Sequence, residues 1–168
     1  YAELVSVSSM SLTRMPAGAV SLIGLVNPVV GTALGVALAG ELFGWAQALG
    51  MVLAEIRPGY ARMTMPVRRD MLNGHQTCHG GYIFMLADSA FAFACNSHNQ
   101  NTVGAGCTID YIAPGREGDL LSAEAVEQAL TGKTGVYDIK VSNQDGRLIA
   151  LFRGKSHRVG GLVAEVTA

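Results

Sequence analysis

The sequence predicts an α+β protein in which one antiparallel β-sheet wraps around a single long central helix. Residues 73–96 open with a polar loop and then run apolar on every face, which is typical of a buried helix. Two stretches before them and four after them show strand-like alternation bounded by turn residues. One sheet built from these stretches must cover the helix, because nothing else in the chain could do so.

The composition fits a single domain with a well-developed core. The chain has 168 residues, of which 49% are hydrophobic and 15% charged. Its 12 basic and 13 acidic residues give a formal net charge of -1. The chain therefore has no excess of positive charge with which to bind nucleic acid. Three cysteines, an odd number without framework spacing, indicate reduced thiols and a cytoplasmic location.

Residues 1–45 form an apolar extension before the domain. No charged side chain occurs from residue 15 to residue 40. We expect this segment to pack against the core, because apolar runs usually mean burial. A targeting segment is an alternative. A membrane span is another, although Asn27 and Pro28 interrupt the run and make membrane association the less favoured interpretation.

Two strands precede the central helix. Residues 51–56 alternate loosely and residues 60–67 alternate well, and Pro58 and Gly59 between them are a strong turn signal, so a hairpin is predicted. A polar loop over residues 68–78 then leads into the helix. At about 17 residues and ~1.5 Å per residue, the helix would be ~25 Å long, enough to cross a domain of this size.

Four strands follow the helix after a polar exit loop at residues 96–101. They are predicted over residues 102–111, 120–130, 135–143 and 147–157. Asp145 and Gly146 form the preferred two-residue hairpin signal between the last two. The folded domain is therefore expected to span residues 46–161, and the tail of residues 162–168 is expected to be loose.

The helix also predicts a partner and a site. A single sheet covers it from one side, so the remaining face would meet a second copy of the chain, which predicts a homodimer. Asp88 is the main polar break in the apolar run. A lone carboxylate is costly to bury unless it is paired or protonated, so Asp88 is either a structural capping group or a chemical one. We favour chemistry.

The chain from residue 47 to residue 161 resembles a known family. The stretches that carry the resemblance are MLNGHQTCHGGYIFMLADSAFAFACNS, CTIDYIAPGREGDLLSA, TGVYDIKVSNQDG and IALFRGKSHRVGG. They are similar to the hotdog-fold thioesterases, and within them to the acyl-CoA thioesterases of phenylacetate degradation. The resemblance implies a sheet wrapped on a central helix, dimers paired into a homotetramer, and hydrolysis of acyl-CoA thioesters with small aromatic acyl groups such as hydroxyphenylacetyl.

The resemblance also implies roles for residues around the helix. It identifies Asp88 as the catalytic carboxylate, acting as nucleophile or as general base, and Ser89 would hold the water or the carboxylate. It places Gly81 at the helix start, where free backbone N–H groups would polarise the thioester carbonyl. Gly80 beside it would let the substrate approach the backbone closely.

Further residues have both a binding and a structural interpretation. Asn73 and His79 would either position the carbonyl or only order the loop. Coenzyme A phosphates could dock on a basic strand end, which is otherwise a solvated surface; the candidate positions there are Gly135, Arg153, Lys155, His157 and Arg158. The family has a polar helper from an N-terminal helix, and this chain has Leu42 near that position.

Other chemistry fits the sequence less well. His75, Cys78 and His79 have compressed spacing and no fourth ligand, so no metal is expected, and no cofactor beyond the coenzyme A of the substrate. Cys78 has no oriented base to make it a nucleophile. Two rival functions remain on the same fold: an enoyl-CoA hydratase or dehydratase, and an acyl-CoA-binding sensor without catalysis. The first needs an acid and base pair, and no His follows Asp88 on the helix.

Overall fold

The computed structural model describes residues 49–164 of the chain. The N-terminal extension of residues 1–45, including Leu42, and residues 165–168 lie outside the described part, so the expectations for them stay predictions. Among the helices that are described, none has both the length and the hydropathy needed to cross a bilayer.

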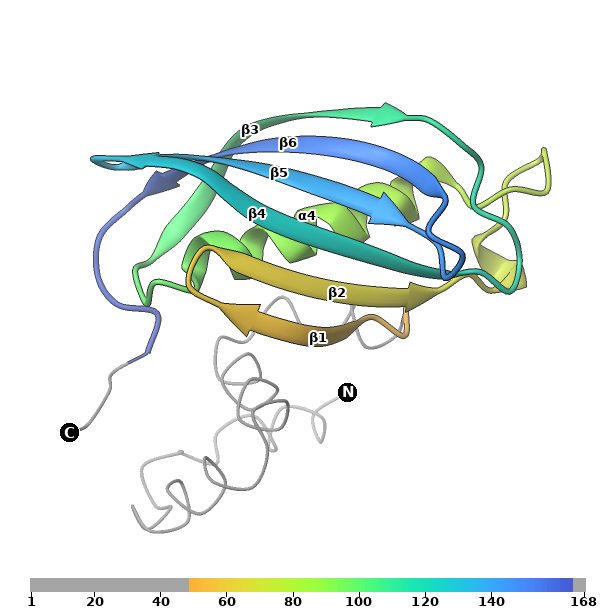
Figure 1. Cartoon of the computed structure of the whole chain (residues 1–168), viewed down its shortest axis with the longest axis horizontal. Coiled ribbons are helices and arrows are strands. Elements are labelled where there is room, and N and C mark those ends of the chain that lie inside the picture. The colour runs from red at the N-terminus through yellow and green to blue at the C-terminus, as the bar shows by residue number, and fades with distance from the viewer. Residues whose placement is uncertain (1–48, 165–168) are drawn as a thin grey trace, which may run out of the picture. The chain divides into compact units, whose positions relative to one another are not determined.

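One long helix packs against one six-stranded antiparallel sheet, as predicted (Figure 1). The sheet order is β1-β2-β4-β5-β6-β3. A short 3-10 turn at Arg69–Met71 precedes the helix. The elements are β1 (Val52–Arg57), β2 (Tyr60–Pro66), α4 (Gly80–Asn96), β3 (Thr102–Tyr111), β4 (Leu120–Thr131), β5 (Thr134–Ser142) and β6 (Leu148–Arg158).

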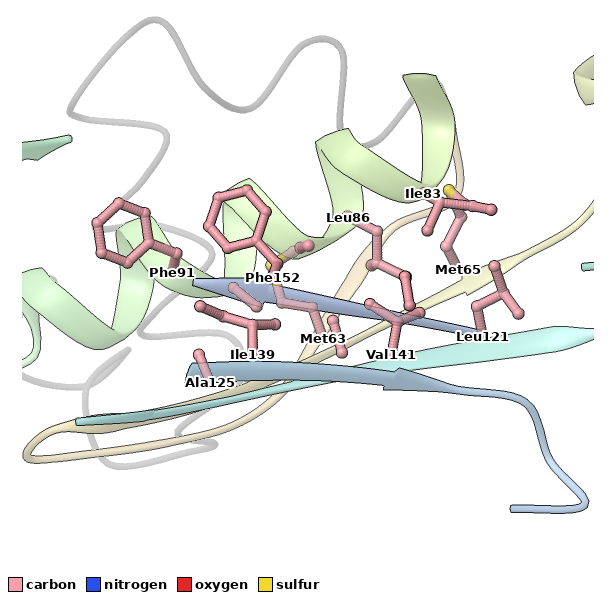
Figure 2. Packing of buried hydrophobic residues seen from close by; sticks show 14 of the residues in the cluster. Met63, Met65, Ile83, Leu86, Phe91, Leu121, Ala125, Ile139, Val141 and Phe152 are labelled. Carbon is pink, nitrogen blue, oxygen red and sulfur yellow. The ribbon is translucent and has the colours of Figure 1, made fainter. Parts of the chain in front are cut away.

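The core lies between the helix and the concave face of the sheet. Figure 2 shows Ile83, Leu86 and Phe91 of α4 directed at side chains of the strands beneath them. The strand side chains on the helix-facing side of the sheet are buried. They include Met63, Met65, Leu121, Ile139, Val141 and Phe152. Apolar burial of this kind is the main favourable contribution to folding, at roughly 25 cal/mol per Å².

The sheet covers α4 from one side only. The helix buries seven residues, whereas Gly81, Met85 and Asp88 are exposed in the single chain. The sequence is mostly apolar on these faces too, so residues 49–164 do not bury the helix on every side. A row of exposed positions on an otherwise apolar helix is what a partner would cover.

The sheet approaches the helix closely where two strands carry glycine. A Cβ placed on Gly154 of β6 would lie 2.8 Å from a ring carbon of Phe91. Gly104, opposite Ser156 on the neighbouring strand, would place a Cβ 3.4 Å from the same ring. These glycines therefore let β3 and β6 pack directly on Phe91.

Replacing Gly154 with alanine is expected to lower the free energy of unfolding by about 1–3 kcal/mol, because the added methyl group overpacks the core. Chemical denaturation of the purified variant measures this change. Gly74→Ala is the matched control, since a Cβ there meets nothing within 4 Å. Equal stability of Gly154→Ala and the parent chain would show that Phe91 can move away at little cost.

Two predicted segments differ from the structure in detail. The β5–β6 connection has five residues, 143–147, and not two. Asn143 closes it, because its side-chain oxygen accepts from the backbone N–H of Asp145 and Arg147. The tail is not loose as far as Ala164, because Asn99 exchanges two hydrogen bonds with the Ala164 backbone.

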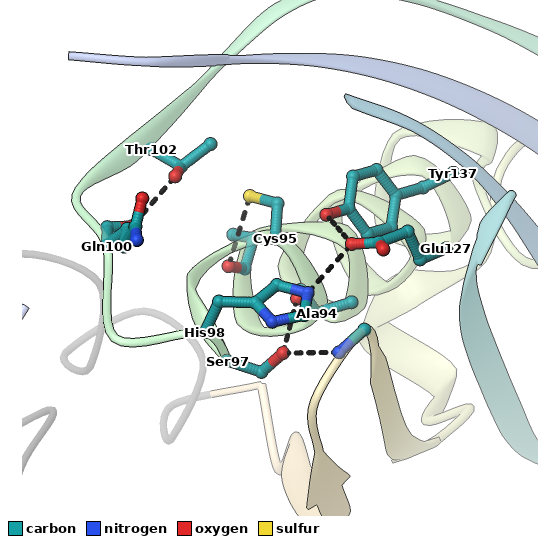
Figure 3. A network of polar contacts seen from close by, with 10 residues as sticks. Ala94, Cys95, Ser97, His98, Gln100, Thr102, Glu127 and Tyr137 are labelled. Atoms are coloured by element: carbon teal, nitrogen blue, oxygen red, sulfur yellow. Dashed lines mark hydrogen bonds and ion pairs between the residues drawn. The ribbon is translucent and has the colours of Figure 1, made fainter. Parts of the chain in front are cut away.

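A polar network fixes the end of the helix against the sheet (Figure 3). Glu127 of β4 accepts from Tyr137 at 2.6 Å and lies 2.9 Å from Nε2 of His98. Burial alone would raise the pKa of Glu127, but the bonds from Tyr137 and His98 bring it below its usual range. A lowered carboxyl pKa stabilises the fold above the unfolded pKa, and this contribution is lost as the pH falls through the folded pKa.

Candidate active site

Asp88 faces a groove between the helix and the edge strand of the sheet. The groove has a volume of about 360 Å³ and is lined by Asp88, Phe91, Ala92 and Cys95 of α4 and by Thr102, Gly104, Gly106 and Cys107 of β3. Its walls are mostly apolar or small. It therefore suits an apolar group held beside a single carboxylate.

The Asp88 carboxylate has no partner among residues 49–164. Among the described residues, none forms a hydrogen bond or an ion pair with this side chain. Although the residue is exposed in the single chain, its apolar surroundings raise the pKa of Asp88 by desolvation. A carboxylate with a raised pKa and no structural partner, in a groove, is typical of a functional group. Ser89 beside it is half-buried.

Two backbone N–H groups at the start of the helix, those of Gly80 and Gly81, differ in their bonding within residues 49–164. His79 is the N-cap, and its Nδ1 accepts from the Gly81 N–H at 3.0 Å, so the ring carries its proton on Nε2. The Tyr82 N–H donates to the His79 carbonyl. The Gly80 N–H has no acceptor within residues 49–164. The free donor at this helix terminus is therefore that of Gly80, while that of Gly81 is occupied.

Asn73 orders the loop that leads to the helix. Its side-chain oxygen accepts from the backbone N–H of His75 at 2.9 Å, from the backbone N–H of Thr77 at 3.3 Å and from the Thr77 hydroxyl at 3.2 Å. The loop is further held by the His79 N–H, which donates to the Met71 carbonyl at 2.8 Å. Asn73 thus stabilises the turn that positions His79.

The donor and the carboxylate cannot act on the same substrate from one chain. Asp88 lies eight residues after Gly80 on the same helix. At ~1.5 Å per residue the two are separated by ~12 Å along the axis. A reacting carbonyl group needs both within about 3 Å. No carbonyl group can therefore contact both the Gly80 N–H and the Asp88 carboxylate of the same chain.

Three of the four basic positions lie on the outer face of the sheet, whereas Arg158 is half-buried and pairs in register with Thr102, which lines the groove of Asp88. Arg153, Lys155 and His157 are exposed and alternate with buried residues of β6, which places them on the face of the sheet opposite α4. Arg153 is already paired with Asp138 through contacts of 2.6 and 2.7 Å. Gly135 is buried, and a Cβ on it would lie 2.6 Å from the Ser156 hydroxyl, so its position is explained by packing.

A larger hollow on that outer face, about 530 Å³, is lined by Asp138 and Arg153 among others. Its Asp138 and Arg153 side chains pair with each other, and it contains none of the residues around the helix start. We place the site at the smaller groove, because that groove contains the unpaired carboxylate.

The cysteine and metal alternatives find no support in the geometry. Cys78 is buried, and burial together with the Asp119 charge raises the pKa of its thiol to about 11, which disfavours the thiolate needed for attack. His75 is exposed and His79 is bonded to Gly81, so they do not converge with the buried Cys78. Across residues 49–164, no three His, Cys, Asp or Glu side chains gather as metal ligands would.

The sequence did not identify the residues of β3 as part of the site. Gly104, Gly106 and Cys107 line the groove, and Tyr111 reaches the first residue of the helix, where its hydroxyl donates to the Gly80 carbonyl at 2.9 Å. The run of small residues in this strand was the available signal. It could not be assigned to the groove before the pairing of β3 at the sheet edge was known.

Comparisons with known proteins identify relatives of this chain. A family model described as the thioesterase superfamily matches residues 75–150. The chain is 52% identical over 118 residues to the acyl-coenzyme A thioesterase PaaI of Escherichia coli (strain K12), covering 70% of this chain and 84% of that protein.

Solved structures are similar as well. The E. coli PaaI protein from the phenylacetic acid degradation operon matches with a TM-score of 0.73 and 48% identity, covering 77% of this chain and 94% of that one. A hypothetical thioesterase protein with coenzyme A from Streptococcus pneumoniae TIGR4 matches with a TM-score of 0.64 and 25% identity, covering 67% and 88%. The resemblance inferred from the sequence is thereby confirmed, and the chain belongs to the thioesterase superfamily with the hotdog fold.

Proposed function

We propose that this chain is an acyl-CoA thioesterase that hydrolyses small acyl-CoA thioesters, of the hydroxyphenylacetyl-CoA type or similar, to the free acid and coenzyme A. The observation that carries the proposal is the pair of unsatisfied groups at the site: the Gly80 N–H at the helix start and the Asp88 carboxylate in the groove. The similarity to an acyl-coenzyme A thioesterase supports the same reaction.

The Gly80 N–H would stabilise the charge that develops on the thioester oxygen. It is a free donor in the first turn of a 17-residue helix, where the partial positive charge of the helix dipole adds to the hydrogen bond. The Gly81 N–H becomes a second donor only if the His79 ring turns away. His79 and Asn73 act here by holding the helix start in place.

Asp88 would supply the nucleophile or the general base of the reaction. Its carboxylate either attacks the carbonyl carbon or takes a proton from a water that attacks it, with Ser89 holding the water. The bond between the acyl carbon and sulfur then breaks, the thiol of coenzyme A leaves with a proton, and water supplies the second oxygen of the acid. The deprotonated carboxylate is required on either route.

The active unit would be a homodimer, and two dimers would form a homotetramer. The ~12 Å between Gly80 and Asp88 along one helix requires two copies for each site. The exposed side of α4 and the edge strand β3 offer a surface for the second copy. Each dimer would hold two sites related by two-fold symmetry.

Coenzyme A would be bound as part of the substrate, without a further cofactor or metal. Since Arg153 is paired with Asp138, the basic groups left for the phosphates are Lys155, His157 and Arg158. The similarity to PaaI and the free cysteines support a cytoplasmic place in phenylacetate catabolism.

The test is release of free thiol from a panel of acyl-CoA thioesters with aromatic, short straight and branched acyl groups. We expect turnover with aromatic members at least as fast as with the others. A chain that binds acyl-CoA without thiol release would be a sensor. One that hydrates enoyl-CoA while keeping the thioester would be a hydratase, and either result would contradict the proposal.

A further inference from the structure

Tyr111 connects the end of an edge strand to the start of the helix. It is the last residue of β3, and its hydroxyl donates to the Gly80 carbonyl at 2.9 Å. Its ring also packs on the same glycine, since a Cβ added to Gly80 would lie 3.1 Å from the ring carbon Cζ and from the hydroxyl oxygen. A side chain that is 51% exposed is thus fixed at its tip by one residue of the site.

The peptide unit between Gly80 and Gly81 is consequently held at both ends. Its carbonyl accepts from Tyr111, and its N–H donates to Nδ1 of His79 at 3.0 Å. A peptide unit is planar, so two bonds in opposite directions fix its orientation. The preceding peptide, which carries the free Gly80 N–H, is held at its other end, because the His79 carbonyl accepts from the Tyr82 N–H.

We propose that Tyr111 is a positioning residue for catalysis, which holds Gly80 so that its N–H stays directed at the thioester carbonyl. This inference rests on the proposed function. Glycine has the greatest backbone freedom of any residue, so the first turn of this helix, which begins with two glycines, gains most from an added restraint. A donor that is already oriented costs no reorganisation when charge develops, which is the condition for strong stabilisation.

The geometry explains why a tyrosine suits this position. Burial raises the pKa of Tyr111, so its hydroxyl stays protonated and remains a donor throughout the neutral range. The bond links β3, which also lines the groove beside Asp88, to the donor at the helix terminus. One β3 strand therefore contributes to the Gly80 half of one site and to the Asp88 half of the other.

The test is Tyr111→Phe, which keeps the ring and removes only the hydroxyl. We expect kcat for thioester hydrolysis to fall roughly threefold to tenfold, the range of one neutral hydrogen bond, with KM changed less than about twofold. Tyr60→Phe, which removes a hydroxyl at the β1–β2 turn, is the matched control and should leave both constants unchanged.

A spectroscopic readout separates positioning from a general structural effect. In protein labelled with ¹⁵N-glycine, the Gly81 amide nitrogen reports hydrogen bonding at the Gly80 carbonyl, and its resonance should move in Tyr111→Phe and not in Tyr60→Phe. An unmoved Gly81 resonance, or a wild-type kcat in Tyr111→Phe, would overturn the inference. A parent chain that releases no thiol would instead contradict the proposed function, and the Gly81 resonance would still test the bond.

Discussion

Replacing Asp88 with asparagine is expected to lower kcat for thioester hydrolysis by roughly 10²- to 10⁴-fold, the range for loss of a positioned acid or base. Asparagine keeps the size of the side chain and removes its charge. Because no described side chain pairs with Asp88, the substitution leaves no orphaned partner, and the melting temperature should stay close to that of the parent chain. Steady-state thiol release and thermal unfolding measure the two effects.

The pH dependence should report the same group. Burial raises the pKa of Asp88, and the deprotonated form is the active one, so activity should fall as the pH drops through that raised pKa, beginning at a higher pH than for an ordinary carboxyl group. This acid limb should vanish in Asp88→Asn. Asp110→Asn, which removes an exposed carboxylate of β3 beside the outer hollow, is the control. Near wild-type hydrolysis by correctly assembled Asp88→Asn would show that another group is the base or nucleophile.

Replacing Gly80 with proline is expected to lower kcat by about 10²- to 10³-fold, the effect of losing one oxyanion donor. Proline lacks the N–H group. It is tolerated at the first helical position, which Gly80 occupies, and the preceding residue must be extended, as His79 is with φ -61 and ψ 132. The comparison measures kcat and KM, with circular dichroism to check the helix.

Gly80→Ala separates the loss of the donor from the added side chain. Both variants place a Cβ within 3.1 Å of the Tyr111 ring, so both require the same movement of that side chain. Only proline removes the N–H, and alanine should therefore retain most of the activity. If alanine and proline lowered kcat equally, the steric change would explain the loss and the Gly80 N–H would not be the donor.

The layout of the fold followed from local patterns. β3 has the predicted bounds and the central helix lies within one residue of them at each end, because a long apolar run and a strand ended by Ala113, Pro114 and Gly115 are signals within the sequence itself. The sequence predicts a two-residue β5–β6 turn at Asp145 and Gly146, whereas the connection in the structure comprises residues 143–147. The side chain of Asn143 adds backbone bonds that a two-residue turn lacks.

Which groups of the site are free to bind substrate could be decided only from the three-dimensional structure. The sequence assigned the carbonyl contact to Gly81, and this prediction stays open, but the His79 ring occupies that N–H and leaves Gly80 as the free donor. The rotamer of His79 decides this, and no sequence pattern encodes it. The pairing of Arg153 with Asp138 likewise depends on the register of β5 and β6, which a run of basic residues does not reveal.

The measurement that tests the shared site most directly is complementation between two inactive variants. Two differently tagged copies, one Asp88→Asn and one Gly80→Pro, are expressed together and the doubly tagged assembly is purified. A mixed dimer has one site with both defects and one with an intact Gly80 and an intact Asp88 from different copies. We expect it to regain up to about half of the parent activity. A mixed assembly as inactive as either variant alone would contradict a site shared between two copies.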